Sequence, residues 1–128
     1  MNTDILIAGT GCSGLYCALN LPQNKKITII TKSDTESNDS FLAQGGICVQ
    51  KDDNDFDAFF EDTLKAGHYE NNKKSVSIMI NSSREIINDL VSFGVDFSKN
   101  ADGSFNYTKE GAHSTSRILF HKDITHNP

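Results

Sequence analysis

The chain reads Gly9-Thr10-Gly11-Cys12-Ser13-Gly14 directly after the apolar run Ile5–Ala8, so a G-x-G-x-x-G motif follows an expected strand. In this motif the first glycine permits a tight turn, and the second lets a pyrophosphate touch the backbone. The third lets the next helix pack closely on the strand. The amide groups and the dipole of that helix favour negative charge. Helical residues 15–21 and a second apolar strand, 27–30, follow. The pattern predicts dinucleotide binding; the alternative is a βαβ turn with a purely structural role.

Length and composition limit the classes of protein. The 128 residues fit one domain or part of one, and 37% of them are hydrophobic. No apolar run is long enough to span a membrane, and the amino terminus enters a strand at once, so we expect neither a membrane protein nor a secretory signal. A net charge of −5 with scattered basic residues argues against a nucleic-acid surface. The three cysteines form neither a disulfide framework nor a metal site, so we expect small buried residues in a reducing cytoplasm.

The residues after the second strand bear on the kind of nucleotide. An NAD-binding unit usually carries an acidic residue there for a ribose hydroxyl, whereas this chain has Thr31-Lys32-Ser33. Lys32 therefore suggests a 2′-phosphate or a different nucleotide, and the alternative is a solvated lysine. A polar loop then leads to Gly45-Gly46, a pair that lets a backbone lie flat against a ligand. A hairpin or a bulge would explain this pair equally well.

Two helices are predicted next. Apolar residues at spacing i, i+3, i+4, i+8 predict one helix over about 55–66, with Asp55 as its N-cap and Gly67 as its stop. The same period predicts a second helix over about 73–93, ended by Gly94. We expect both apolar stripes to belong to the core rather than to a cofactor site.

The last third of the chain predicts a hairpin and a polar loop. Residues 95–97 and 105–107 flank the turn signal Asp102-Gly103, which is typical of a short hairpin. The polar stretch 109–117 has neither a helical nor a strand period, which favours a site loop rather than packing. Its histidine and serine have no acidic partner at triad spacing, so nucleophilic catalysis is not expected.

Five segments taken together resemble the L-aspartate oxidases, which belong with the flavoprotein subunits of succinate dehydrogenase and fumarate reductase. In chain order they read G-T-G-C-S-G-L (9–15), T-K (31–32), S-F-L-A-Q-G-G-I (40–47), E-D-T-L-K-A-G (61–67) and Y-T-K-E-G-A-H-S-x-x-R-I-L (107–119). The resemblance covers nearly the whole chain in the correct order. Its most specific parts are A-Q-G-G and E-G-A-H-S.

This resemblance implies an α/β fold with an incomplete Rossmann-like FAD-binding βαβ unit (4–31) and a flavin loop (39–46). Two helices, about 55–66 and 73–93, and a short β-hairpin with a site loop (95–117) would follow. FAD would bind without a covalent bond, because covalent members carry a histidine at the position of Asp39. The residues that the resemblance places on FAD are Gly9, Thr10, Gly11, Cys12, Ser13, Gly14, Lys32, Asp39, Ser40, Phe41, Leu42, Ala43, Gln44, Gly45 and Gly46.

The implied reaction is oxidation of L-aspartate to iminoaspartate, with oxygen or fumarate as acceptor. Quinolinate synthase would be a partner on the route to NAD. Glu110 falls where the family has a carboxylate that orients the substrate amino group. The family continues well beyond this length, so the resemblance implies an amino-terminal fragment that is inactive alone, with no metal, nucleic-acid or membrane partner. Two alternatives remain: a fumarate reductase or succinate dehydrogenase fragment, disfavoured by Asp39 and Glu110, and a non-catalytic nucleotide-binding module.

Overall fold

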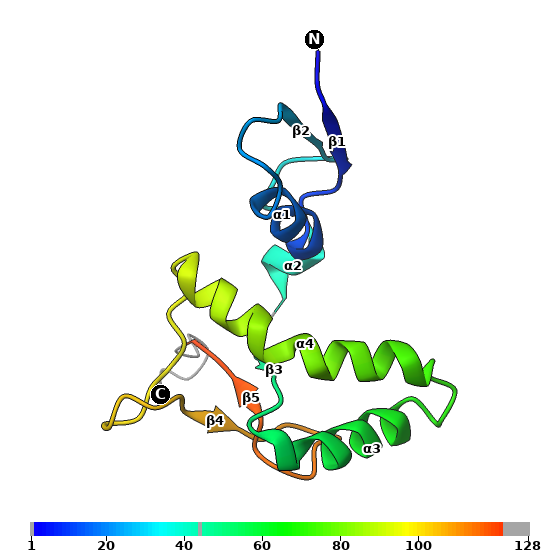
Figure 1. The fold of residues 1–128 in the computed structure, drawn as a ribbon, viewed down its shortest axis with the longest axis vertical. Coiled ribbons are helices and arrows are strands. Elements are labelled where there is room, and N and C mark those ends of the chain that lie inside the picture. The colour runs from blue at the N-terminus through cyan, green and yellow to red at the C-terminus, as the bar shows by residue number, and fades with distance from the viewer. Residues whose placement is uncertain (1, 44, 122–128) are drawn as a thin grey trace. The chain divides into compact units, whose positions relative to one another are not determined.

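The chain folds into two compact units, Met1–Gln44 and Gly45–Pro128. The computed structural model describes residues 2–43 and 45–121, and Figure 1 shows the order of the elements along the chain. None of the described helices is long and apolar enough to cross a membrane.

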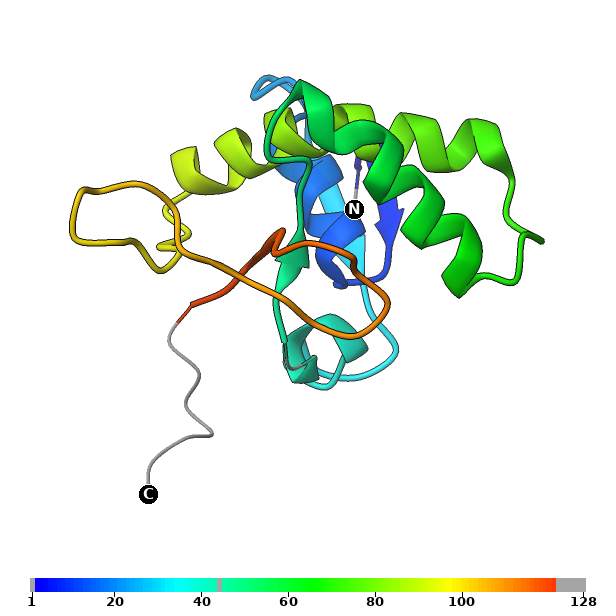
Figure 2. The ribbon, with the colours of Figure 1, turned by 90° about the horizontal axis from the view of Figure 1, so that it is seen from below.

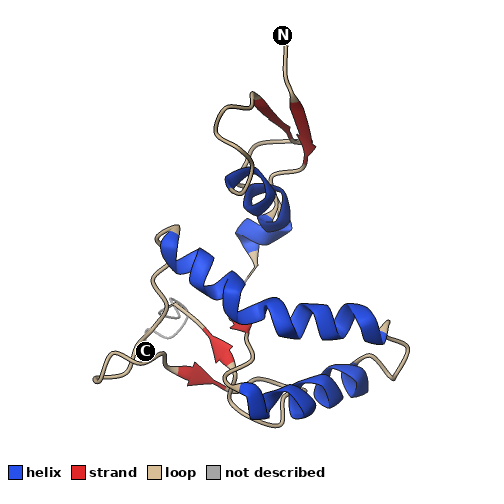
Figure 3. Cartoon of the chain, viewed as in Figure 1, coloured by secondary structure: helices blue, strands red, loops and turns tan. Residues whose placement is uncertain are grey.

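The amino-terminal unit is a strand–helix–strand arrangement with a short additional helix. Its elements are β1 (Ile5–Ala8), α1 (Cys12–Leu19), β2 (Ile27–Ile30) and α2 (Asp39–Leu42). The strands β1 and β2 pair in parallel, with Ile5 opposite Ile27, which requires a crossover connection such as α1; Figure 3 shows the two strands in red. The predicted parallel strand–helix–strand order is therefore confirmed.

Helix α1 begins at Cys12 as predicted but ends at Leu19, two residues earlier than expected. The end is explained by the sequence that follows, because a proline at position 22 disfavours helical geometry in the residue before it. The Asn20 side chain donates to the Tyr16 carbonyl at 2.9 Å, which satisfies one of the last carbonyl groups of the helix.

The expectation that the cysteines are buried is wrong for two of them. Cys12 and Cys17 are exposed, and Cys48 is half-buried. Helix α1 contains no buried residue at all, and even Leu19 is 62% exposed. The physical reason is that a sheet of two four-residue strands covers little of the helix within the described residues.

The carboxy-terminal unit packs two helices beside a small sheet. Its elements are β3 (Ile47–Cys48), the 3₁₀ helix η1 (Asp53–Asp55), α3 (Phe56–Ala66), α4 (Lys73–Ser92), β4 (Tyr107–Thr108) and β5 (Ile118–Leu119). The sheet has the order β3-β5-β4 with both pairs antiparallel. Helices α3 and α4 contact each other and lie side by side in both views (Figure 1, Figure 2).

The core of this unit consists of two clusters of buried apolar residues. One joins α3 to α4 and contains Phe59, Leu64, Val76 and Ile80; the other joins α4 to the sheet and contains Val49, Ile87, Phe97 and Leu119. Most of the predicted stripes are therefore core. Met79 and Val91, which the helical period also assigns to the stripe of α4, are exceptions; they are 45% and 40% exposed because they lie off the line of buried positions on this helix.

The predicted ends of the two long helices are close to the observed ones, and Asp55 is the N-cap residue of α3 as predicted. Its side chain, however, accepts no capping hydrogen bond from the first turn of the helix. Its carboxylate instead receives hydrogen bonds from a distant arginine, Arg117, described below. At the end of α4, the Val95 amide donates to the Leu90 carbonyl at 3.0 Å across Gly94, so the predicted stop is confirmed.

The predicted hairpin is present only at its tip. The chain reverses at Asp102-Gly103, and Lys99 and Phe105 form an isolated antiparallel bridge. Residues 95–97 form no strand, and β4 pairs with β5 instead. Pairing with β5 is favoured because it adds β4 to a sheet that already contains β3.

Candidate functional site

The glycine motif forms the turn between β1 and α1. Gly9 has φ of +109°, a conformation that glycine adopts without steric cost. A Cβ atom on Gly14 would lie 2.5 Å from the Gly9 carbonyl oxygen, so α1 approaches the strand more closely than a side chain allows. Gly11 is the N-cap of α1 and has no side chain to cap the amides of the first turn. The turn therefore has the close packing that the motif requires, and its helix N-terminus suits an anion.

Side chains from later in the same unit lie against this turn. Ser40 Oγ accepts a hydrogen bond from the Cys12 amide at 3.0 Å. The hydroxyl of Thr10, which is buried, donates to Thr31 Oγ1 at 3.2 Å, and Asn38 Nδ2 donates to Thr10 Oγ1 at 3.5 Å. The amino-terminal unit thus brings the ends of β1 and β2 and the segment 38–40 together.

The other predicted cofactor residues of this unit are exposed. Lys32 follows Thr31 directly, at the end of β2, and its side chain is exposed. The exposed residues of the predicted flavin loop here are Asp39, Ser40, Phe41, Leu42 and Ala43, with Phe41 and Leu42 at 61% and 65% exposure. Gln44, also predicted to contact the flavin, lies outside the described residues.

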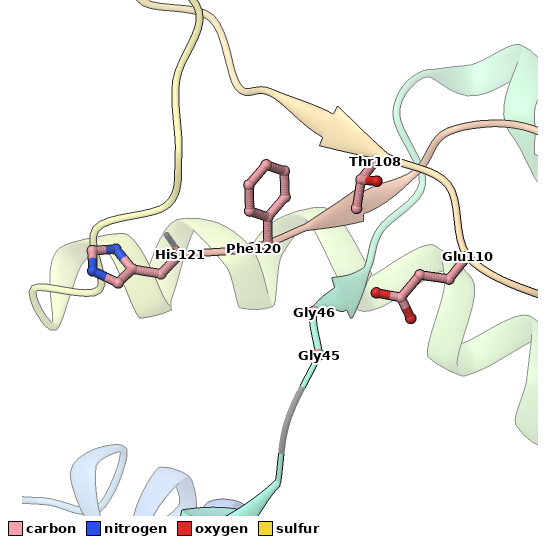
Figure 4. A pocket seen from close by; sticks show the side chains of 6 residues that line it. All are labelled: Gly45, Gly46, Thr108, Glu110, Phe120 and His121. Atoms are coloured by element: carbon pink, nitrogen blue, oxygen red, sulfur yellow. The ribbon is translucent and has the colours of Figure 1, made fainter. Parts of the chain in front are cut away.

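Glu110 borders a pocket of about 200 Å³ in the carboxy-terminal unit. The pocket is lined by Gly45, Gly46, Thr108, Glu110, Phe120 and His121. Figure 4 shows the Glu110 carboxylate directed toward the glycine pair, and a Cβ atom on Gly45 would lie 4.0 Å from Glu110 Oε1. Three of the predicted site residues, Gly45, Gly46 and Glu110, therefore meet at one pocket although they are far apart in the sequence.

Three residues that line this pocket were missed by the sequence analysis. Thr108 lies inside the segment 107–119 that carries the resemblance, so a signal for it was present. Phe120 and His121 follow β5 directly, and nothing in the sequence indicates that β5 lies between two other strands. The His121 ring nitrogen Nδ1 contacts the Asp96 carbonyl, which ties this end of the pocket to the segment after α4.

Gly46 also has a structural role. A Cβ atom there would overlap the Ile118 side chain and the Leu119 carbonyl oxygen, because β5 lies directly against the backbone of this residue. Strand packing therefore accounts for one glycine of the pair. The other, Gly45, has φ of +111°.

A buried ion network holds the far end of the polar loop 109–117. Arg117 is fully buried, and its Nη2 and Nε donate to the two carboxylate oxygens of Asp55 at 2.7 and 3.2 Å. Its Nη1 donates to Asp62 Oδ2 at 2.6 Å, and the guanidinium lies 4.8 Å from the centre of the Phe59 ring. The prediction that this stretch is a site loop rather than packing is therefore wrong for Arg117.

Two neighbouring residues of the loop join the same network. The amide and the hydroxyl of Ser114 both donate to Asp62 Oδ2 at 2.7 Å. His113 Nδ1 accepts from Arg117 Nη1 at 3.0 Å. Ser114 thus has an acidic partner, but one 52 residues away that no local spacing reveals. Among the described residues no hydrogen bond joins His113 to Ser114, so the arrangement is an anchor and lacks the order of a catalytic triad.

The network changes the ionisation of its members. Burial disfavours the charged form of Asp62, but hydrogen bonds from Ser114 and Arg117 outweigh it and lower the pKa of Asp62 from 3.8 to about 2. Burial also disfavours the charged form of Asp55, but hydrogen bonds from Arg117 and from the Lys51 amide outweigh it and lower the pKa of Asp55. Both carboxylates are therefore ionised at neutral pH, and Arg117 is balanced by two negative charges.

The depressed pKa of Asp62 predicts a loss of stability in acid. Its folded pKa of about 2 lies below the unfolded value of 3.8, so its contribution is complete above about pH 5 and is lost as the pH falls toward 2. The contribution is about 2 kcal/mol. Urea unfolding between about pH 6 and pH 3 should show a steeper loss of stability for the wild type than for Asp62→Asn. Equal slopes would contradict this prediction.

Comparisons with known proteins bear on this geometry. The chain matches the FAD binding domain family over residues 4–127. It is 48% identical over 125 residues to L-aspartate oxidase of Clostridium acetobutylicum, covering 98% of this chain and 29% of that protein. It is also 36% identical over 130 residues to L-aspartate oxidase of Pseudomonas aeruginosa, covering 95% of this chain and 24% of the relative. The chain spans less than a third of the length of these curated relatives.

Solved structures give the same picture of the fold. A mutant of FrdA of E. coli quinol fumarate reductase superposes with a TM-score of 0.85 at 27% identity, over 94% of this chain and 21% of that one. A Mycobacterium smegmatis Sdh1 structure superposes with a TM-score of 0.83 at 22% identity, over 94% of this chain and 21% of that one. The second likeness is too distant in sequence to support more than a shared fold.

Proposed function

We propose, from the premise that the chain belongs to the family of FAD-binding domains, that residues 1–128 form the FAD-binding part of an L-aspartate oxidase. The complete enzyme oxidises L-aspartate to iminoaspartate and passes the electrons to oxygen or fumarate. Quinolinate synthase consumes the product on the route to NAD. The observation that carries this proposal is 48% identity to an L-aspartate oxidase, against 27% to a fumarate reductase flavoprotein.

The residues of the amino-terminal unit fit FAD. The N-terminus of α1, capped by Gly11 without a side chain, suits the pyrophosphate, with Thr10–Ser13 around it. By the resemblance, Lys32 would take the place of the acid that usually binds a ribose, and Asp39–Gly46 would run along the pyrophosphate and the flavin, with Gln44, Gly45 and Gly46 nearest the ring. Binding is non-covalent because Asp39 offers no imidazole. Bound FAD supplies a flavin that accepts a hydride, and the protein binds and orients it.

In this proposal, Glu110 recognises the amino group of the substrate. L-aspartate differs from fumarate and succinate in carrying an amino group, so a selective site needs a partner for that group. The Glu110 carboxylate lies at the pocket that Gly45 and Gly46 line, beside the segment proposed for the flavin ring. A carboxylate there would accept a charge-assisted hydrogen bond from the substrate ammonium group.

Replacing Glu110 with glutamine tests this role in the complete enzyme. Loss of one charged hydrogen bond, about 1.5–3 kcal/mol, should lower kcat/KM for L-aspartate by about 10- to 150-fold. Fumarate reduction brings no amino group into the site and should be unchanged. Steady-state kinetics with both substrates gives the ratio of the kcat/KM for aspartate oxidation to that for fumarate reduction.

The matched control is Glu85→Gln, a change at an exposed residue of α4 that should leave both reactions unaltered. Equal losses of kcat/KM with both substrates, or no loss with either, would show that Glu110 does not recognise the amino group.

A separate observation tests whether the chain is part of an oxidase. Coding sequence that continues in frame after residue 128 supports the oxidase, and a stop there favours a nucleotide-binding module.

A further inference from the structure

We propose that Asp62 and Ser114, held by buried Arg117, are positioning residues that set the place of the Glu110 carboxylate. The inference rests on the proposed role of Glu110. It adds that contacts between the loop and Asp62 of α3 influence the selectivity for the substrate. Neither Asp62 nor Ser114 lines the pocket that contains Glu110. Their action is therefore through the loop backbone.

The first step is that Glu110 itself is weakly held. Its side chain is exposed, and among the described residues its carboxylate has no hydrogen-bond partner. Packing and side-chain contacts therefore do little to place this carboxylate. Its position depends on the backbone of the loop that follows it.

The second step is that this backbone follows a strained turn. The His113 amide donates to the Glu110 carbonyl at 3.4 Å, which closes a turn over Gly111 and Ala112. Ala112 has φ of +69°, a left-handed conformation that alanine rarely adopts. Such a conformation persists only where the surrounding structure holds it.

The third step identifies what holds the turn. Immediately after it, Ser114 donates two hydrogen bonds of 2.7 Å to a single oxygen, Asp62 Oδ2. That oxygen also accepts from Arg117 Nη1 at 2.6 Å, and Arg117 is bound at its other side to Asp55. The end of the turn is thus fixed to η1 through Asp55 and to α3 through Asp62. Loosening Ser114 frees the turn to relax, and the Glu110 carboxylate moves with it.

The experiment is a double-mutant cycle in the complete enzyme. Ser114→Ala removes the hydroxyl bond to Asp62 at an exposed position, so the protein should still fold. We expect the ratio of aspartate oxidation to fumarate reduction to fall by about 3- to 10-fold. In the Glu110→Gln background the same substitution should leave the ratio unchanged, because the residue through which Ser114 acts is already altered. Both reactions are measured on one preparation, so any unfolded fraction cancels from the ratio.

A matched control and a second measurement complete the test. Ser92 is also exposed, and within the described part of the chain its hydroxyl donates only to the Asp89 carbonyl in the same helix, so Ser92→Ala should not alter the ratio. Hydrogen exchange of the 128-residue chain should show faster exchange at residues 110–114 in Ser114→Ala than in Ser92→Ala.

The outcomes separate the inference from the proposed function. If Glu110→Gln changes the ratio but Ser114→Ala does not, the inference is wrong and the role of Glu110 stands. If Ser114→Ala lowers the ratio equally in both backgrounds, Ser114 acts by another route and the inference is again wrong. If Glu110→Gln has no effect on the ratio, the proposed role of Glu110 fails and the inference fails with it.

Discussion

Arg117→Met should lower the free energy of unfolding of the chain by about 3–5 kcal/mol. The substitution fills a similar volume but leaves the carboxylates of Asp55 and Asp62, which are 6% and 15% exposed, without their cation. An uncompensated buried charge is among the most destabilising changes in a protein. Urea unfolding followed by far-UV circular dichroism is a suitable measurement, because α3 and α4 contain 11 and 20 residues and dominate the helical signal.

The chain offers a matched control for this prediction. Arg84 pairs with Asp53 at 2.5 Å, but the two side chains are 47% and 88% exposed. Exposed ion pairs contribute about 0–1 kcal/mol, so Arg84→Met should have a correspondingly small effect. Equal effects of the two substitutions would mean that the buried network does not stabilise the carboxy-terminal unit.

Gly46→Ala should have the second largest effect on stability and lower the free energy of unfolding by about 3 kcal/mol. The added methyl group would overlap the Leu119 carbonyl oxygen, which belongs to the backbone and cannot turn away as a flexible side chain can. Strand β3 would have to separate from β5, and the pocket that contains Glu110 would open at the glycine pair. The midpoint of urea unfolding is the measurement.

Gly111→Ala is the control for Gly46→Ala. A Cβ atom on Gly111 would meet nothing within 4 Å, and the residue does not need a positive φ. Its replacement should therefore change the stability by less than about 0.5 kcal/mol. Similar midpoints for the two variants would show that the close approach of β5 to Gly46 is unimportant.

Much of the fold could be predicted because its signals are local. The apolar runs at 5–8 and 27–30 and the glycines between them specify a strand–turn–helix–strand arrangement over about 30 residues. The helices α3 and α4 follow from a period of apolar residues within each segment. Asp55 is the predicted N-cap residue, but its carboxylate caps no amide of α3, because Arg117, a partner from a distant part of the chain, binds it instead.

The candidate site was predictable only where residue type alone carried the information. Glu110 and the glycine pair belong to short segments that resemble those of a known family, so they could be predicted as site residues without knowledge of the fold. That Gly45, Gly46 and Glu110 share one pocket, together with Thr108, was not visible. It depends on β5 lying between β3 and β4, and strand order is a property of the whole unit.

The sequence by itself determined the glycine turn, the two long helices and the residue types at the pocket, because glycine conformation and apolar periodicity act over a few residues. Only the tertiary structure decided that Arg117 is an anchor. Its partners Asp55 and Asp62 are 62 and 55 residues away, and nothing in the local pattern distinguishes a buried arginine from one in a site loop. Burial makes the difference, because a charge withdrawn from water must find its opposite charges wherever the fold places them.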